Sequence, residues 1–378
     1  MDFTALTQYI DSLSRDMVPG IDVVVYQEHN PIYRHFAGMR DREAGIPMDG
    51  RELYWIFSAT KVFTVTAALK LVEKGLMWLD DPVSDYLPAY GTLSVEENGR
   101  IRGAWKQMTL RHLFSMTGGL SYELDTPSIQ KALLYSRGKA DTLTLVNAFA
   151  EEPLLFDPGT HYRYSLCHDV LAAVIEVVSG KKYQDYLKTA VFEPLGITRT
   201  GFFGEDISEF AQQYIYDEAT QTSRVLPGGN TNVYRLSENY ASGGAGLYSC
   251  VDDYILLSDA LACGGVGKSG AQILRPDTID LMRTPQLTEE LHKEFNAWVT
   301  HVSPRYSYGL GVRTLVDAAE SASPKGEFGW DGAANAYTLI DPENRLSAFV
   351  GMHIRGFGYG YGTIHPAIRD LIYEGLKK

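Results

Sequence analysis

The sequence predicts a mixed α/β fold of the α+β type, in which an antiparallel sheet built from both chain termini is flanked by helices and carries a mostly helical inserted domain. Two observations lead to this prediction. β-rich runs occur near both ends of the 378-residue chain, whereas its middle consists of helical patterns joined by long loops. Because each face of a sheet is buried against another layer, one sheet formed from the two ends accounts for this arrangement. We expect residues 1–84 and 236–378 to form the sheet domain and residues 85–235 to form the inserted domain.

The first elements are expected to be a helix, a hairpin and a second helix. Apolar residues between positions 3 and 13 recur at helical spacing. Two β-rich runs, 21–27 and 32–38, flank a polar turn and predict a hairpin. A largely apolar helix is then expected over residues 58–74, with Gly75 as its stop.

The second half of the chain is expected to supply two buried helices and the remaining strands. The segment DVLAAVIEVVSG predicts a helix that ends at Gly180, and a Gly-rich turn opens another at about 251–262. The stretch FGWDGAANAYTLIDPENRLSAFVGMHI contains three strand-like runs with a turn at 341–344. A helix with Pro366 near its start closes the chain.

Composition limits the partners and the location. The net charge is −13 and no run of lysine or arginine occurs, so we expect no nucleic-acid partner, because phosphate neutralisation requires clustered basic charge. No stretch of about 18 apolar residues and no signal-peptide pattern is present, so we expect no membrane span and a cytoplasmic location. Three scattered cysteines, Cys167, Cys250 and Cys263, favour free thiols. The oligomeric state stays open.

The first candidate for chemistry is Ser58-Ala59-Thr60-Lys61, which lies between the apolar segment WIF and an apolar helix. Residues i and i+3 share a helix face, so the lysine amine can take the serine proton while unpaired N–H groups at the helix start stabilise an oxyanion. The alternative is that Ser58 is a plain N-cap and Lys61 a surface lysine. Spacing alone does not decide, because it recurs at Ser128/Lys131, Ser136/Lys139 and Ser179/Lys182.

The second candidate is Tyr164, in the segment FDPGTHYRYS just before a predicted apolar helix. A tyrosine beside a lysine ammonium can have a lowered pKa and act as a general base. The alternative is simple packing, since the chain has 24 tyrosines. His161 and His168 flank this tyrosine without metal-ligand spacing, so we expect neither a metal nor a cofactor.

The third candidate is the segment FGWDGAANAY. A strand that ends at Gly332-Ala333 can place backbone N–H groups beside a pocket, whereas the alternative is an ordinary strand bend with Trp330 packed in the core. The glycine-rich segment GFGYGYG at 356–362 matches no phosphate-binding motif, and the absence of GxSxG argues against an α/β-hydrolase.

Taken in order, these segments resemble the serine β-lactamase-like superfamily, and most closely its branch of class C β-lactamases, D-Ala-D-Ala peptidases and related esterases. The resemblance spans about residues 15–355 and also includes GLMWLDDPVSDYLP, MTLRHLFSMTGGL and SGGAGLYSCVDDY. It implies a β-lactamase/transpeptidase-like fold. By position, Ser58 matches the nucleophile, Lys61 its partner amine and Tyr164 the tyrosine of the second motif. The resemblance also implies an oxyanion site formed by the backbone N–H groups of Ser58 and Ala333.

The departures from the family pattern concern the substrate. Leu166 stands where the lactamases have asparagine, and Trp330 stands where they have a carboxylate-binding lysine. Losing a charge-assisted contact costs about 1.5–3 kcal/mol, roughly a tenfold to hundredfold loss of affinity. Asp331 lies beside the implied oxyanion site, where it could pair with Lys61 or receive a cationic substrate group. The expected substrate-binding residues are therefore Leu166, Trp330, Asp331 and Gly332.

These residues predict a serine hydrolase that cleaves esters or small amides through a covalent acyl-enzyme, with an esterase-like preference. One alternative in the same class is a D-amino-acid peptidase or a weak β-lactamase. An alternative of another class is a catalytically silent binding or regulatory protein on the same fold.

Overall fold

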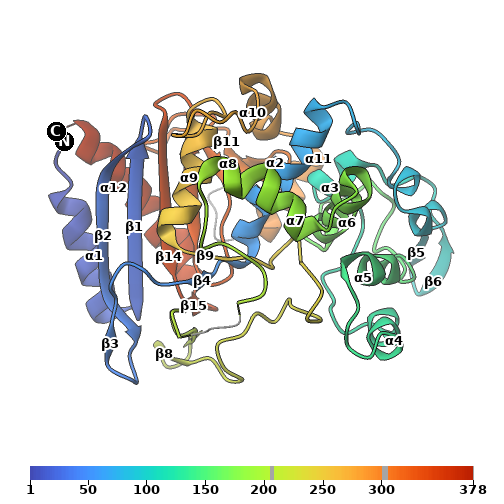
Figure 1. Ribbon diagram of the computed structural model, residues 1–378, viewed down its shortest axis with the longest axis horizontal. Coiled ribbons are helices and arrows are strands. Elements are labelled where there is room, and N and C mark those ends of the chain that lie inside the picture. The colour runs from blue at the N-terminus through green and yellow to red at the C-terminus, as the bar shows by residue number, and fades with distance from the viewer. Residues whose placement is uncertain (205–207, 300–304, 378) are drawn as a thin grey trace.

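A computed structural model describes residues 1–204, 208–299 and 305–377 of the chain. Its largest element is an eight-stranded sheet in the order β10-β11-β12-β13-β14-β1-β2-β3 (Figure 1). Every neighbouring pair in this order is antiparallel. The strands are β1 Gly20–Gln27, β2 Asn30–Asp41, β3 Ile46–Pro47, β10 Tyr306–Tyr308, β11 Arg313–Leu315, β12 Phe328–Gly329, β13 Tyr337–Asp341 and β14 Leu346–Met352.

The centre of this sheet joins the two ends of the chain. Strand β1 pairs with β14 in a continuous register from Ile21 opposite Met352 to Gln27 opposite Leu346. The prediction of an antiparallel sheet built from both termini is therefore confirmed. The predicted hairpin is present as β1 and β2, both longer than expected.

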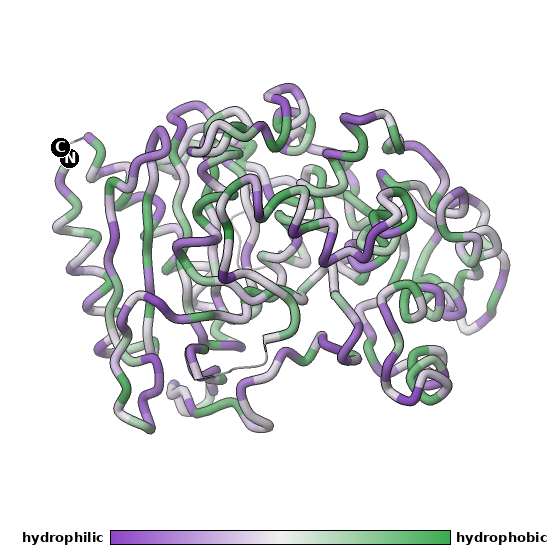
Figure 2. Tube along the Cα trace, viewed as in Figure 1, coloured by the Kyte–Doolittle hydropathy of each residue, from purple (hydrophilic) through white to green (hydrophobic). Residues whose placement is uncertain are grey.

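Helices cover both faces of the sheet. On one face α1 (Thr4–Asp16) and α12 (His365–Lys377) contact each other, and the apolar cluster beneath them includes Val23 and Val25. On the other face α9 (Val251–Ala262) packs against β14, β1 and β13, and Val24 belongs to the cluster on that side. Successive side chains of β1 thus enter opposite cores, as a strand covered on both faces requires. Figure 2 shows β1 as largely hydrophobic and the tip of the β2–β3 turn as hydrophilic.

The middle of the chain contributes most of the remaining helices. Helix α2 (Thr60–Glu73) contacts α6 (Cys167–Ser179), and both are almost entirely buried. The other helices are α3 Leu110–Phe114, α4 Pro127–Tyr135, α5 Thr142–Phe149, α7 Tyr183–Leu187, α8 Glu193–Leu195, α10 Pro276–Arg283 and α11 Glu289–Trp298. None of the helices in the described ranges combines the length and the apolar character that a membrane crossing requires.

The remaining strands are short and lie outside the large sheet, and apart from the strand-like apolar approach to Ser58 they were not predicted. They are β4 Tyr54–Trp55, β5 Ser94–Glu97, β6 Arg100–Gly103, β7 Tyr214–Asp217, β8 Thr222–Val225, β9 Tyr248–Ser249 and β15 Ile354–Arg355. The β5–β6 hairpin turns at Asn98-Gly99, both with positive φ, which is a recognisable two-residue turn signal. Strand β7 pairs in parallel with β15, so a segment of the predicted insert joins the C-terminal part of the chain. The exact division at residues 85 and 235 stays a prediction.

Candidate active site

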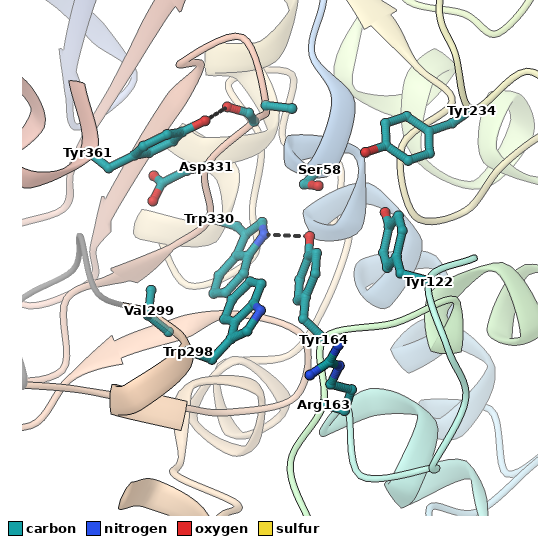
Figure 3. Close-up of a pocket in the computed structure, with 12 residues that line it drawn as sticks. Ser58, Tyr122, Arg163, Tyr164, Tyr234, Trp298, Val299, Trp330, Asp331 and Tyr361 are labelled. Carbon is teal, nitrogen blue, oxygen red and sulfur yellow. Dashed lines mark hydrogen bonds between the residues drawn. The ribbon is translucent and has the colours of Figure 1, made fainter. Parts of the chain in front are cut away.

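A pocket of about 470 Å³ brings together most of the residues singled out in the sequence (Figure 3). Six predicted residues line it, and they come from three separate stretches of the chain: Ser58, Tyr164, Trp330, Asp331, Gly332 and Ala333. Lys61 lies next to Ser58 and is completely buried. The pocket also contains residues that the sequence did not single out: Tyr122, Arg163, Tyr234, Trp298, Val299 and Tyr361.

Ser58 lies in a 3-10 turn, η1 (Phe57–Ala59), between β4 and α2. The helix expected to begin at Ser58 begins at Thr60, and Ser58 makes no capping hydrogen bond, so the plain N-cap interpretation is wrong. Phe57 has φ +45°, a strained value for a residue with a bulky side chain, and the burial of its ring holds it there. This turn leaves the Ser58 hydroxyl at the pocket wall.

Lys61 is not a surface lysine, which rules out the alternative interpretation of that residue. Its Nζ lies 3.4 Å from the Ser58 Oγ and donates to the Gly244 carbonyl oxygen at 2.7 Å. Burial lowers the pKa of Lys61 from 10.5 to about 7, and the negative charge of Asp169 acts in the opposite direction. The amine beside Ser58 therefore changes its protonation state near neutral pH.

The other serine–lysine pairs of equal spacing have ordinary surface roles. Lys131 pairs with Glu151, Lys139 with Glu238 and Lys182 with Asp141, and each lysine is substantially exposed. The spacing is the same in all four pairs, and the apolar residues around Ser58 and Lys61 are the feature of the sequence that separates this buried pair from the three surface pairs.

Tyr164 lies close to the start of α6, as expected, separated from Cys167 by Ser165 and Leu166. The Tyr164 ring stacks on the ring of Tyr122, with the centroids 5.5 Å apart, and on the ring of Trp298, with the centroids 4.5 Å apart. Lys61 Nζ lies 4.5 Å from the centroid of the Tyr164 ring. The Tyr164 hydroxyl accepts a hydrogen bond from Trp330 Nε1 at 3.2 Å and points toward Ser58 (Figure 3). Burial raises the pKa of Tyr164, so the expectation of a lowered pKa is wrong. Tyr164 is a neutral phenol at neutral pH.

The chain after β12 packs its backbone against the chain before Ser58. A Cβ on Gly332 would lie 2.2 Å from the Ile56 carbonyl oxygen, so only glycine permits this approach. The next residue, Ala333, lines the pocket, and within the described ranges no carbonyl oxygen accepts its backbone N–H. The Tyr361 hydroxyl donates to the Gly332 carbonyl oxygen at 2.8 Å and holds this segment from the other side.

We expect Gly332→Ala to lower kcat/KM for an ester by about a hundredfold, because the added methyl must displace backbone beside Ser58 and misplace the reacting groups. Steady-state ester hydrolysis measures this. Gly103→Ala is the matched control, since a Cβ at Gly103 meets no atom within 4 Å. Equal, small effects of the two substitutions would show that the close approach at Gly332 does not matter.

Asp331 is paired with a buried arginine that the sequence did not reveal. Arg313 Nη1 donates to Asp331 Oδ1 at 3.2 Å, and Arg313 Nη2 donates to the Thr338 carbonyl oxygen at 3.0 Å. Arg313 is also 3.6 Å from Glu327, so one guanidinium faces two carboxylates. Burial raises the pKa of Asp331 to about 6, against the opposing effect of Arg313. The observed charge partner of Asp331 is thus Arg313, rather than Lys61.

Leu166, predicted to bind substrate, does not line this pocket. It is buried at the start of α6 and faces a separate small cavity together with Leu120, Ile129 and Phe149. The side chain at this position therefore contributes to packing. The resemblance thus led to the segment that contains Tyr164, which lines the pocket, but the predicted contact of Leu166 with this pocket is absent.

One group of potential metal ligands occurs within the described ranges. His29, Asp259 and Cys263 place their ligand atoms within 4.8 Å of one another. The backbone N–H and Nδ1 of His29 both bond to Asp259, so the group already serves as a tether between the β1–β2 turn and the end of α9. Elsewhere His161 bonds to Glu294 and His168 contacts the Phe114 carbonyl oxygen. The three cysteines are free, as predicted, and the structure shows that all three are buried.

An antiparallel sheet flanked by helices, with a serine, a buried lysine and a tyrosine meeting beside a glycine-containing strand, defines the serine β-lactamase-fold class. The chain belongs to the Beta-lactamase family, whose model matches residues 6–360.

The chain is similar over most of its length to two curated proteins and to one solved structure. Esterase EstB from Burkholderia gladioli is 28% identical over 376 residues, covering 94% of this chain and 90% of the relative. Monacolin J acid methylbutanoyltransferase from Aspergillus terreus is 28% identical over 338 residues, covering 83% and 78%. The solved structure of EstCE1, described as a hydrolase with promiscuous acyltransferase activity, is 26% identical with a TM-score of 0.80, covering 98% and 97%. These findings confirm the expected family and fold, and they support an esterase-like serine hydrolase.

Proposed function

We propose that this protein hydrolyses carboxylic esters of small molecules, with Ser58 as the nucleophile. The observation that carries the proposal is the contact between the Ser58 hydroxyl and the buried amine of Lys61, whose pKa lies near 7. An amine that is neutral at working pH can accept the hydroxyl proton, which makes the serine oxygen a competent nucleophile. The similarity to esterase EstB and to the hydrolase EstCE1 supports the same assignment.

In the proposed mechanism Ser58 Oγ forms a bond to the ester carbonyl carbon as Lys61 takes its proton. The N–H groups of Ser58 and Ala333 stabilise the oxyanion. The proton then passes from Lys61 through the Tyr164 hydroxyl to the leaving oxygen, the C–O bond to the alcohol breaks, and the acyl group stays on Ser58. Water then attacks the acyl carbon as Lys61 takes a proton from it. The bond between the acyl carbon and Ser58 Oγ breaks, the proton passes from Lys61 to Ser58 Oγ, and the acid is released. No cofactor enters these steps.

The walls of the pocket favour apolar groups. Half of its twelve lining residues are aromatic: Tyr122, Tyr164, Tyr234, Trp298, Trp330 and Tyr361. Such surfaces bind acyl and alcohol portions by apolar contact, whereas Trp330 cannot supply the ammonium that a substrate carboxylate needs. We therefore propose uncharged esters as the preferred substrates, in a cytoplasmic setting.

A second candidate function is acyl transfer to an alcohol. It uses the same acyl-enzyme, with an alcohol in place of water. The acyltransferases among the relatives, together with an aromatic pocket able to bind an alcohol, favour it. Adding an alcohol acceptor to an ester hydrolysis should then divert part of the acyl group into a new ester.

A substrate panel tests the proposed function. Initial rates are compared for p-nitrophenyl esters of increasing chain length, small amides, a D-amino-acid amide and nitrocefin. We expect the esters to have the highest kcat/KM. Faster turnover of the D-amino-acid amide or of nitrocefin would favour the peptidase or β-lactamase alternative. Absence of turnover with tight, non-covalent binding would favour a silent binding protein.

The pH dependence should follow Lys61. Because burial lowers the lysine pKa to about 7, the amine is protonated below that pH and neutral above it. We expect kcat/KM for a neutral ester to rise about tenfold per pH unit below pH 7 and to level off above it. A profile that is flat between pH 5 and 9 would contradict the role given to Lys61.

We propose that Asp331 Oδ2 faces the substrate, because Arg313 binds the other oxygen, Oδ1. We expect Asp331→Asn to lower kcat/KM for an amine-bearing ester, relative to its neutral isostere, by about tenfold above pH 6. The ratio of the two esters is the measurement, so a general loss of activity cancels. An unchanged ratio would show that Asp331 takes no part in substrate selection.

A further inference from the structure

A second buried carboxylate, Asp169 on α6, lies close to the site without belonging to the pocket. Its side chain is 1% exposed. Oδ1 accepts hydrogen bonds from the Tyr240 hydroxyl and the Ser242 hydroxyl, each at 2.6 Å. Oδ2 is buried and has no hydrogen-bond donor within the described residues. A buried carboxylate oxygen without a donor is costly unless a charge lies nearby to compensate it.

The nearby charge is Lys61. A methyl group placed on Gly244 would lie 2.6 Å from Asp169 Oδ2 and 3.5 Å from Lys61 Nζ, which limits the separation of those two atoms to about 6 Å. Among the described parts of the chain, neither Asp169 nor Lys61 forms an ion pair within 4 Å with any other residue. The two charges therefore face each other across Gly244, whose carbonyl oxygen also accepts the Lys61 hydrogen bond.

The other titratable groups around this pair are uncharged at neutral pH. Burial raises the pKa of the Cys167 thiol to about 11 and lowers that of His168 well below its ordinary value. It also raises the pKa values of the surrounding tyrosines, which come from several elements: Tyr90, Tyr122, Tyr164, Tyr183 and Tyr240. Asp169 is thus the negative charge that acts on the Lys61 amine.

We propose that Asp169 is a positioning residue that acts through Lys61: its fixed negative charge stabilises the protonated form of that amine and so favours proton transfer from Ser58. The Tyr240 and Ser242 hydroxyls keep the carboxylate oriented, and the same loop presents the Gly244 carbonyl oxygen to Lys61. The effect of Asp169 on catalysis rests on the proposed function. The interaction between the charges of Asp169 and Lys61 is independent of that function.

The test is the titration of Lys61 in Asp169→Asn. Removing the negative charge should shift the Lys61 pKa downward by on the order of one to two units, as expected for charges separated by no more than about 6 Å in a protein interior. NMR of lysine labelled at the side chain measures this in a Ser58→Ala background, with the signal assigned by its loss in Lys61→Met. The rise of kcat/KM with pH should also move to lower pH in Asp169→Asn. The value of kcat at high pH, where it no longer changes with pH, should be lower than in the native protein.

Two further measurements separate charge from structure. Ser242→Ala removes one hydrogen bond to Asp169 and keeps its charge, so the Lys61 titration should move by much less than in Asp169→Asn. If Asp169→Asn does not fold, adding Lys61→Met should restore a cooperative unfolding transition, because no uncompensated buried amine is left. A Lys61 titration unmoved by Asp169→Asn, an upward shift, or failure of that rescue would overturn the inference. Turnover that survives Ser58→Ala would instead refute the proposed function, and the NMR titration would still report the coupling.

Discussion

Ser58→Ala is expected to abolish ester turnover, with a loss of kcat on the order of 10⁴–10⁶-fold, as for nucleophile removal in other serine hydrolases. The substitution removes the oxygen that would carry the acyl group and leaves Lys61 and Tyr164 without a group to activate. Labelling by a fluorophosphonate probe should disappear with the activity. Initial ester hydrolysis rates and gel detection of the probe measure both effects.

Unfolding would give the same loss, so the variant needs a structural control. Ser58 makes no capping hydrogen bond to α2 and lies at a pocket wall, so its removal should leave thermal unfolding almost unchanged. Ser128→Ala tests the same spacing at a site where the following lysine binds Glu151 on the surface, and it should keep full activity. Substantial turnover by folded Ser58→Ala would exclude a nucleophilic role.

Lys61→Met should have the second largest effect, a fall in kcat on the order of 10³–10⁵-fold. Methionine keeps an unbranched apolar side chain that reaches as far as the Cε position of lysine, and it supplies no base. The hydroxyl of Ser58 then keeps its proton at neutral pH, and the rise of activity through pH 7 should vanish together with the rate. A pH profile of the residual activity measures both changes.

Lys131→Met is the matched control for Lys61→Met, because it removes an exposed lysine at the same spacing from a serine. It should change neither rate nor pH profile. Removal of a buried amine also affects stability, so thermal unfolding of both variants is compared first. A folded Lys61→Met with activity within tenfold of the native protein would show that another group accepts the Ser58 proton.

Much of the fold follows from local patterns in the sequence. The run IDVVVY has strong β propensity, and the two-ended sheet followed from finding similar runs near the C-terminus. Strands β7, β8 and β15 were missed because their signals are weak: β15 has two residues, and most residues of β7 and β8 are only partly buried or exposed. Parallel pairing of β7 with β15 joins residues about 140 positions apart, which no local pattern indicates.

The candidate site could be predicted where residues share a motif. Ser58, Lys61 and Tyr164 each lie at a junction of an apolar helix, so sequence and resemblance located them. Trp298 and Tyr234 come from segments without a recognisable pattern. Tyr122 lies three positions after Gly119 of the Gly-Gly turn in MTGGLS, a segment that the sequence did single out.

The charge states could not be predicted. They depend on burial, which turns Lys61 into a near-neutral base and keeps Tyr164 protonated. Arg313 and Asp331 are separated by 18 positions and are brought together by the pairing of β11 with β12, which no motif indicates, so the sequence left the partner of Asp331 open.

The measurement closest to the central claim is the intact mass of the protein after rapid mixing with an ester, followed by peptide mapping. The residue next to the buried amine is proposed to carry the acyl group, so the mass should rise by that of the acyl group, with the increment located on the peptide that contains SATK. An increment on any other peptide, or complete ester turnover by a protein that never gains mass under acid quench, would contradict the account.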